Sequence, residues 1–173
     1  MSEWVDVVDD DDRVVGRAPR AEMRRRNLPH RAVYILVVNA RGELFVHERT
    51  PSKDVYPGYR DVTVGGVVAA GENYDTAAAR EVAEELGVQA ALERLGPTVY
   101  EDEGTRVRGM VYLARHDGPF VLQPEEIVSG EFVALARALE LTRQERCCPD
   151  GAAVLRDYAG RLAAPGGSGV RGG

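Results

Sequence analysis

One segment, residues 66–88, places strand, loop and helix signals side by side and constrains the fold more than any other part of the sequence. It opens with apolar residues that favour a strand and continues through a loop bounded by glycines. Asp75 then offers an N-cap, residues 76–86 are good helix formers, and Gly87 supplies a C-terminal stop. The segment therefore predicts a strand, a loop and a helix in direct succession.

Three glutamates share one face of that predicted helix. Glu81, Glu84 and Glu85 are spaced i, i+3 and i+4, so their carboxylates point the same way. Like charges repel at this spacing, whereas a bound Mg²⁺ or Mn²⁺ would attract all three, because these ions prefer carboxylate oxygens. For the glutamates taken alone, a solvated acidic face with Arg80 and Glu84 as an i,i+4 ion pair is the simpler interpretation.

The segment also matches a longer pattern. In that pattern Gly is followed after five residues by Glu, and after seven more by Arg-Glu, an aliphatic residue, any residue, Glu-Glu, any residue, Gly and an aliphatic residue. The matching positions are Gly66, Glu72, Arg80, Glu81, Val82, Glu84, Glu85, Gly87 and Val88. Seven fixed identities at typical residue frequencies coincide by chance about once in 10⁸ starting points. The segment closely resembles the Nudix box.

This resemblance to the Nudix superfamily implies both a fold and a reaction. Nudix proteins form an α/β/α sandwich with a mixed central sheet, and we expect that fold here with an N-terminal β-hairpin. In the family, the box binds one or more Mg²⁺ ions that bridge a diphosphate, and water attacks phosphorus. We therefore expect a Mg-dependent pyrophosphohydrolase whose small-molecule substrate is a nucleoside diphosphate derivative or a related diphosphate.

The resemblance also assigns roles within the box. Arg80 is expected to orient Glu72 and the helix through a charge-assisted hydrogen bond. The implied metal ligands are Glu81, Glu84, Glu85 and the carbonyl of Gly65.

The general base stays open, because in this family it comes either from the box or from a later loop. Glu84 is the candidate within the box. The later candidates lie in residues 101–103 and 125–126. Among these we favour Glu126, which comes just before a predicted strand.

Two basic segments are candidates for substrate contact. The polar loop 49–60 leads directly into the strand before the box, so Arg49 and Lys53 are predicted to bind the diphosphate. Ordinary loop solubility is the alternative. Residues 24–26 are three consecutive arginines, which form either a solvated face or a contact for a phosphate or an acidic partner.

Outside the box, the chain resembles the Nudix branch that includes isopentenyl-diphosphate isomerase and its hydrolase-like bacterial relatives. The shared features are the N-terminal hairpin, His30-Arg31, and residues 49–58 with Arg49, Lys53 and Pro57-Gly58. The isomerase needs a cysteine acid/base, which residues 61–66 lack, and a histidine metal cluster, for which only His30 is available. We expect hydrolysis rather than isomerisation. A non-catalytic Nudix binding or regulatory module is the remaining alternative, although such modules commonly have eroded boxes.

Composition limits the partners and the compartment. The chain of 173 residues has a net charge of −6, which argues against binding nucleic acid through its phosphates. No apolar run is long enough for a membrane span, and the acidic N-terminus is not a signal peptide. The adjacent Cys147 and Cys148 suggest free thiols in a reducing compartment. We expect a cytoplasmic enzyme that does not bind membranes, with a homodimer possible for the family.

The remaining pattern predicts one domain over residues 1–163 and a disordered glycine-rich tail over residues 164–173. A last helix is predicted to begin near Pro149, with Asp150 as its N-cap. Further helices are predicted at 21–26 and 135–139. Strands are predicted at 4–8, 13–17, 32–39, 43–48, 62–68, 94–100, 105–114, 120–122 and 131–133.

Overall fold

The computed structural model describes residues 3–162, so the predicted tail at 164–173 lies outside the described residues. The elements follow the chain in the order β1 (Trp4–Val8), β2 (Val14–Pro19), α1 (Arg20–Arg26), β3 (His30–Val38), β4 (Leu44–Arg49), β5 (Arg60–Asp61), β6 (Val64–Val67), α2 (Tyr74–Leu86), β7 (Leu92–Glu101), β8 (Arg106–Arg115), β9 (Ile127–Val133), α3 (Leu135–Leu141) and α4 (Pro149–Tyr158). A short 3₁₀ turn, Ala159–Arg161, follows α4.

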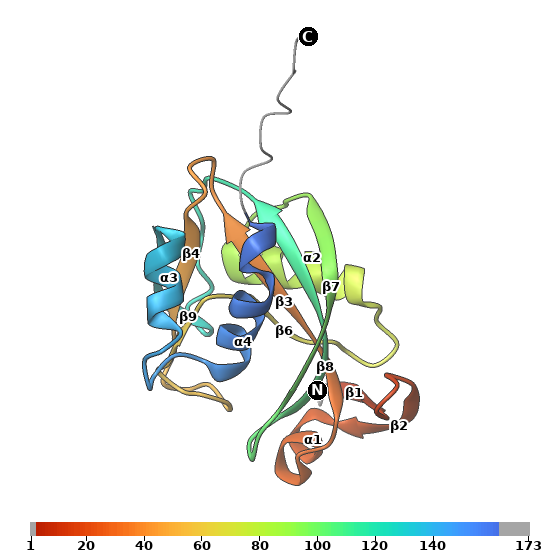
Figure 1. Ribbon diagram of the computed structural model, residues 1–173. Coiled ribbons are helices and arrows are strands. Elements are labelled where there is room, and N and C mark those ends of the chain that lie inside the picture. The colour runs from red at the N-terminus through yellow and green to blue at the C-terminus, as the bar shows by residue number, and fades with distance from the viewer. Residues whose placement is uncertain (1–2, 163–173) are drawn as a thin grey trace.

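A mixed sheet of nine strands forms the middle layer (Figure 1). Strand β3 is its organising strand, since it pairs in parallel with β8 and antiparallel with β1, β4 and β6. Strands β7 and β9 extend the sheet by antiparallel pairing with β8 and β4. The predicted mixed central sheet is confirmed.

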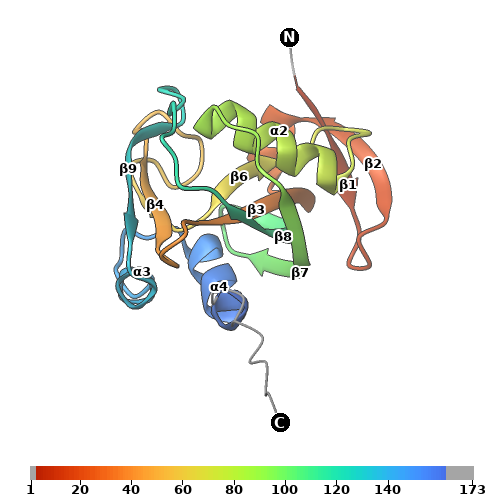
Figure 2. The ribbon, with the colours of Figure 1, turned by 90° about the horizontal axis from the view of Figure 1, so that it is seen from above.

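Helices cover both faces of this sheet, with α2 on one side and α3 and α4 on the other (Figure 2). The alternating residues of β3 explain the two layers. Val33 and Ile35 pack with Val82 of α2, whereas Leu36 packs with Leu155 of α4. A strand that is apolar on both faces needs cover on both sides, so the sequence of β3 alone favours this sandwich.

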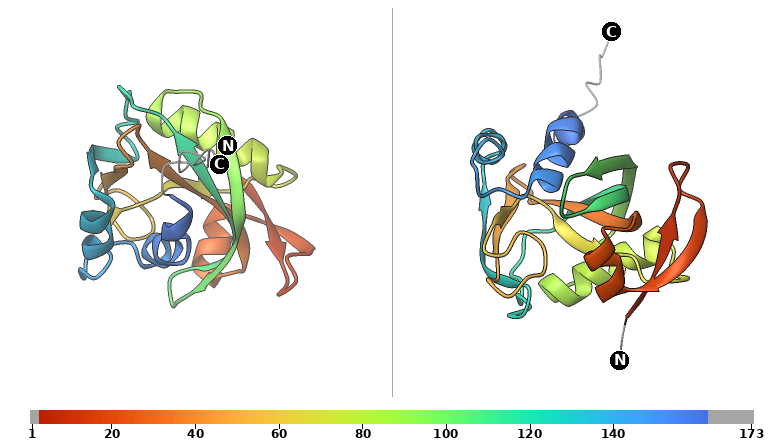
Figure 3. Two further views of the ribbon diagram at one scale, coloured as in Figure 1. Left: turned by 45° about the horizontal axis from the view of Figure 1, so that its top comes forward. Right: turned by 90° about the horizontal axis from the view of Figure 1, so that it is seen from below.

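The N-terminal hairpin β1–β2 and helix α1 lie to one side of the sandwich (Figure 3). The hairpin pairs with β3 at Val7 and His30, and an isolated bridge joins Val5 to Ala69 just after β6. Helix α1 buries Met23 against Val5, and Asn27 ends the helix in the left-handed conformation. This arrangement brings Arg20 and Arg24 of α1 near His30 at the start of β3.

Three local predictions were wrong. Helix α2 starts earlier than expected and is capped by Asn73, whose side chain accepts a hydrogen bond from the Thr76 amide at 2.8 Å, so Asp75 is not the cap. Asp150 is likewise not an N-cap, because it lies inside α4 after Pro149. Residues 120–122 form no strand, since their backbone instead meets the C-terminal end of α2 through the Val121 amide and the Leu86 carbonyl.

Within residues 3–162, every helix is too short or too polar to cross a lipid bilayer.

Candidate active site

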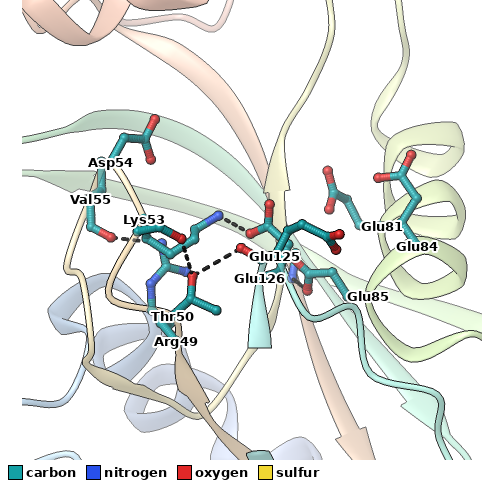
Figure 4. Close-up of polar contacts among 12 residues, drawn as sticks. Arg49, Thr50, Lys53, Asp54, Val55, Glu81, Glu84, Glu85, Glu125 and Glu126 are labelled. Atoms are coloured by element: carbon teal, nitrogen blue, oxygen red, sulfur yellow. Dashed lines mark hydrogen bonds and ion pairs between the residues drawn. The ribbon is translucent and has the colours of Figure 1, made fainter. Parts of the chain in front are cut away.

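The box carboxylates, Glu81, Glu84 and Glu85, extend from one face of α2 (Figure 4). Glu81 and Glu85 are buried, with 8% and 6% of their surfaces exposed, whereas the Glu84 side chain remains half exposed. The i,i+4 spacing places Glu81 and Glu85 on one side of the helix, and both point toward strand β6. The sequence therefore predicted their common face, and packing against the sheet buries two of the three.

Two glycines of β6 make room for these buried acids. A Cβ atom on Gly66 would lie 2.7 Å from the Glu81 carboxylate, so any larger residue would displace that group. Gly65 has φ 153°, and a Cβ there would lie 2.0 Å from the Val33 carbonyl oxygen. Its amide donates to Glu85 Oε2 at 3.2 Å. The main-chain carbonyl of Gly65 stays a predicted metal ligand.

Arg80 ties the box together, as the sequence predicted. Its Nε and Nη2 donate to the two carboxylate oxygens of Glu72, both at 2.8 Å, which is the fork geometry of a strong pair. Its Nη1 donates to Glu81 at 2.9 Å and to Glu84 at 3.3 Å. The hydrogen bonds from Arg80 lower the pKa of Glu72 below its usual value.

Arg80 does not neutralise the whole cluster. Burial, together with the charges of Glu84 and Glu126, raises the pKa of Glu81 to about 7. Burial and the neighbouring Glu81 and Glu126 raise the pKa of Glu85 well above its ordinary value. Buried carboxylates that repel one another form a donor set suited to a hard divalent cation, so the residues present fit such an ion. As the side chains stand in residues 3–162, no three acidic, His or Cys groups converge closely enough to enclose one.

The loop predicted to bind phosphate lies across from the box. Lys53 is ion-paired with Glu126 (Figure 4), and both side chains are largely buried. The Thr50 amide donates to the Glu126 carbonyl at 3.2 Å, which joins this loop to the segment before β9. Arg49 donates from Nη2 to the Val55 carbonyl at 2.8 Å. The structure thus brings together Lys53 and Glu126, two residues the sequence analysis considered separately.

The candidates for general base are not equally placed. Glu126 is close enough to raise the pKa of both Glu81 and Glu85, and Glu84 lies on the same helix face. Glu101 is the last residue of β7 and pairs with Arg108, and residues 102–103 lie in the turn between β7 and β8. The geometry favours Glu126 and Glu84 as neighbours of the box, and the base role itself stays a prediction.

A pocket adjoins the box at Gly65 and Gly66 and encloses about 590 Å³, its open mouth included. Its cationic lining consists of Arg20, Arg24, Arg49 and Lys53. Arg24 donates to Asp54 at 3.2 Å, and Arg20 reaches the same carboxylate at 3.3 Å. Burial and the neighbouring arginines lower the pKa of Arg24, against the opposing effect of Asp54.

The three consecutive arginines of the sequence separate in space. Only Arg24 lines the pocket, while Arg25 is exposed and Arg26 pairs with Glu22 at 2.9 Å. Sequence reasoning missed Arg20 altogether. Helical spacing could have found it, because residues four apart lie on the same face of a helix.

The pocket has acidic lining as well, which the sequence analysis missed. Asp61 of β5 and Asp150 of α4, here called the acid pair, both border it. Tyr34 donates to Asp150 Oδ2 at 2.9 Å. Burial and the charge of Asp150 raise the pKa of Asp61 to about 7, against the opposing effect of Arg49. Burial also raises the pKa of Asp150. The only sequence signal was the cap prediction at Asp150, which assigned the wrong role.

His30, the one histidine available for an isomerase-like metal cluster, is buried, and so are the two cysteines. His30 Nδ1–H donates to the Leu28 carbonyl at 2.9 Å, and burial lowers its pKa to about 4. Cys147 and Cys148 are free, as predicted, and burial raises the pKa of Cys147 to about 12. Neither thiol is ionised near neutral pH.

Comparison with known proteins decides the family. The family model described as the NUDIX domain matches residues 28–148, which is most of the chain. The chain belongs to the Nudix family. The matched region begins two residues before β3 and ends at the residue before α4, and it contains the box, the loop 49–60 and Glu126.

Relatives of this Nudix chain extend the similarity beyond the matched domain. A Nudix hydrolase from Pseudomonas aeruginosa is 45% identical over 158 residues, covering 91% of this chain and 94% of the relative. The structure of DR0079 from Deinococcus radiodurans has a TM-score of 0.77 and 30% identity, over 90% of this chain and 98% of the other. The chain is thus a Nudix hydrolase with an α/β/α sandwich, in a family that generally uses divalent metal ions.

A more distant structure shares the fold. The NUDIX domain of Shewanella oneidensis NrtR, solved in complex with ADP ribose, has a TM-score of 0.62 and 16% identity, over 76% of this chain and 87% of that domain.

Proposed function

We propose that this Nudix hydrolase is a Mg²⁺-dependent pyrophosphohydrolase, with Mn²⁺ as an alternative ion. It cleaves a diphosphate linked to another moiety, a nucleoside diphosphate derivative or a similar compound. The observation that carries the proposal is the pair of buried carboxylates, Glu81 and Glu85, one helical turn apart beside a pocket lined by cations. Buried like charges at this spacing are unfavourable unless a cation binds them.

In this proposal the box carboxylates hold the metal, with the carbonyl of Gly65 as a further ligand. A bound divalent ion neutralises the diphosphate and acidifies a water molecule. Arg80 fixes Glu72 and Glu81 through its hydrogen bonds of 2.8 and 2.9 Å, so the carboxylates keep their orientation through the reaction.

Lys53 and Arg49 are the proposed phosphate contacts. Lys53 is paired with Glu126, and a diphosphate that accepts hydrogen bonds from Lys53 competes for that contact. Glu126 is then released to accept a proton from the attacking water, and Glu84 is the second candidate for this role. Because water adds to phosphorus while the bridging oxygen leaves, the products are a monophosphate and a phosphorylated remainder.

A nucleotide-derived substrate is supported by two observations. The NUDIX domain of NrtR was solved with ADP ribose. The pocket beside the box is also lined by four cationic side chains, Arg20, Arg24, Arg49 and Lys53, which suit an anionic phosphate ester. The partner is therefore proposed to be a small molecule rather than nucleic acid or a membrane.

The test is hydrolysis of a diphosphate panel by the purified chain with Mg²⁺, with the products identified by mass. We expect turnover of at least one nucleoside diphosphate derivative, loss of turnover on chelation, and recovery on adding Mg²⁺ or Mn²⁺. Glu84→Gln should lower the rate, whereas Glu140→Gln, an exposed change on helix α3, should not. Turnover that is unaffected by chelation and by Glu84→Gln would contradict the assigned mechanism.

A further inference from the structure

The acid pair is unusual because it borders a pocket whose other charged groups are mainly cations. Asp150 is fully engaged, since its Oδ1 accepts from the Gly151 amide and its Oδ2 from the Tyr34 hydroxyl, both at 2.9 Å. Asp61 uses one oxygen only. Its Oδ1 accepts from the Thr63 amide at 3.0 Å and from the Thr63 hydroxyl at 3.1 Å.

The second oxygen, Asp61 Oδ2, accepts no hydrogen bond from any residue between 3 and 162. The closest cation is Arg49, whose Nη1 lies 4.0 Å away, beyond hydrogen-bond distance. Arg49 Nε is itself buried without a partner among the described residues. Asp61 Oδ2 is therefore an unused acceptor at the pocket, where buried polar groups are ordinarily paired.

The local structure holds Asp61 in this position. A Cβ atom on residue 151 would lie 2.3 Å from Asp61 Oδ1, so only glycine lets α4 approach that carboxylate. The hydrogen bonds from Thr63 fix the carboxylate plane. Asp61 is 8% exposed, so its free oxygen is held near the pocket with little contact with bulk water.

The chemistry of this oxygen selects the kind of group that can lie against it. A phosphate would be repelled, and a hydrocarbon chain would remove water from the carboxylate without replacing the lost hydrogen bonds. An N–H donor satisfies it. The exocyclic amino group on the hydrogen-bonding edge of a nucleobase is such a donor.

We propose that Asp61 accepts a hydrogen bond from an amino N–H of the substrate's nucleobase, with Asp150 and Tyr34 buttressing the acid side of the pocket. This inference rests on the proposed function, since it assigns the non-phosphate half of the same substrate. Arg49 Nη1 lies 4.0 Å from Asp61 Oδ2, and despite its burial the charges of Asp61, Asp150 and Glu85 raise the pKa of Arg49. The diphosphate then lies toward the box and the base toward the acid pair.

The first test needs no variant. The wild-type chain is assayed with pairs of nucleoside diphosphates that differ by one amino group: adenosine against purine riboside, guanosine against inosine, and cytidine against pyrimidin-2-one riboside. In at least one pair, loss of the amino group should lower kcat/KM by about 10- to 100-fold, because a buried charged acceptor is left unpaired. Differences below about twofold in all three pairs would overturn the inference.

The second test removes the acceptor. Asp61→Asn keeps the Oδ1 acceptor for Thr63 and puts an N–H₂ donor in place of Oδ2. We expect this variant to lose the preference for the amino compound through KM rather than kcat, and to keep activity on the compound without the amino group. Asp157→Asn, an exposed change on the same helix as Asp150, is the matched control. An unchanged preference in Asp61→Asn would overturn the inference.

A binding measurement tests the role of Asp61 independently of the proposed hydrolytic function. Nucleoside monophosphates are titrated into metal-free wild-type and Asp61→Asn protein by calorimetry. If no diphosphate is hydrolysed but the wild type alone discriminates the amino group in binding, the proposed function fails and the inference stands. If diphosphates are hydrolysed without such discrimination, the function stands and the inference fails. Faster hydrolysis of isopentenyl diphosphate than of every nucleotide would also overturn it.

Discussion

Two groups of buried carboxylates are built differently: the acid pair lines the pocket, whereas Glu81 and Glu85 lie against Gly66 and Gly65 at its edge. Glu81 and Glu85 lie one turn apart on α2, where Arg80 is the nearby cation. Asp61 and Asp150 come from β5 and α4, and their partners are mostly neutral donors, Tyr34 and Thr63 with backbone amides. Burial raises the pKa in both groups.

The difference separates two uses of a buried acid. The box carboxylates crowd together with more negative charge than Arg80 can balance, which suits a divalent cation. The acid pair has nearly all its oxygens satisfied by neutral donors and leaves one free, which suits a hydrogen bond to a substrate. The same substitution, carboxylate to amide, should therefore have different consequences in the two places.

The largest expected effect is at the box. Glu85→Gln removes a charged ligand and should lower kcat by about 100- to 1,000-fold, the scale of losing one strong electrostatic contact at a reaction centre. The metal-free protein should not become less stable, because a buried charge with a like-charged neighbour is removed. Turnover and urea unfolding of the metal-free protein check both parts. Retained activity would remove Glu85 from the proposed metal site.

At the acid pair, we expect the main effect on the pH dependence of the free energy of unfolding. The folded-state pKa of Asp61 is raised to about 7, so the folded state binds the proton more tightly than the unfolded state. The stabilisation that Asp61 gives the folded state by binding this proton is complete below pH 4 and is lost as the pH rises to about 7. Over that window the wild type should lose on the order of 3 kcal/mol more than Asp61→Asn. Urea unfolding at pH 4 to 8 measures this, and parallel curves would contradict it.

Arg80 tests whether one cation holds the box carboxylates in place. Arg80→Ala leaves Glu72 and Glu81 without their charged partner and should reduce the free energy of unfolding by about 2 kcal/mol. The free energy of unfolding of Arg80→Lys should lie between those of the wild type and Arg80→Ala, because an ammonium group cannot form the two parallel hydrogen bonds to Glu72. The measurement is thermal or urea unfolding, with Arg137→Ala on helix α3 as an exposed control. Equal stability of the wild type and both Arg80 variants would show that the two hydrogen bonds from Arg80 to Glu72 do not stabilise the fold.

The smallest expected effect concerns the loop cation. Lys53→Ala should raise KM by about tenfold, a loss of about 1.4 kcal/mol that is typical of one charged contact. Its effect on kcat should be smaller, because the same change also releases Glu126. Steady-state kinetics with a substrate found in the panel measures both constants. An unchanged or lower KM in the variant would contradict the role of Lys53 as a phosphate contact.

The main elements of the fold and half of the site could be predicted from sequence, and the local nature of the signals explains why. The spacing of Glu81, Glu84 and Glu85 determines a common face on any helix, and the pairing of Arg80 with Glu72 followed from the box pattern. The cap at Asn73 was missed because Asp75 is an equally good capping residue, and the helix start is decided by which backbone amide the side chain reaches.

The box, its helix and the apolar strand β3 that needs cover on both faces are local features, and they can be recognised from the sequence. The meeting of distant groups depends on packing, which brings together Lys53 and Glu126, Arg24 and the pocket, and Asp61 and Asp150. The physical reason is that helical and strand periodicity relate neighbours within a few residues. Contacts between β5 and α4 depend on how the sheet packs against a helix, which no short spacing records.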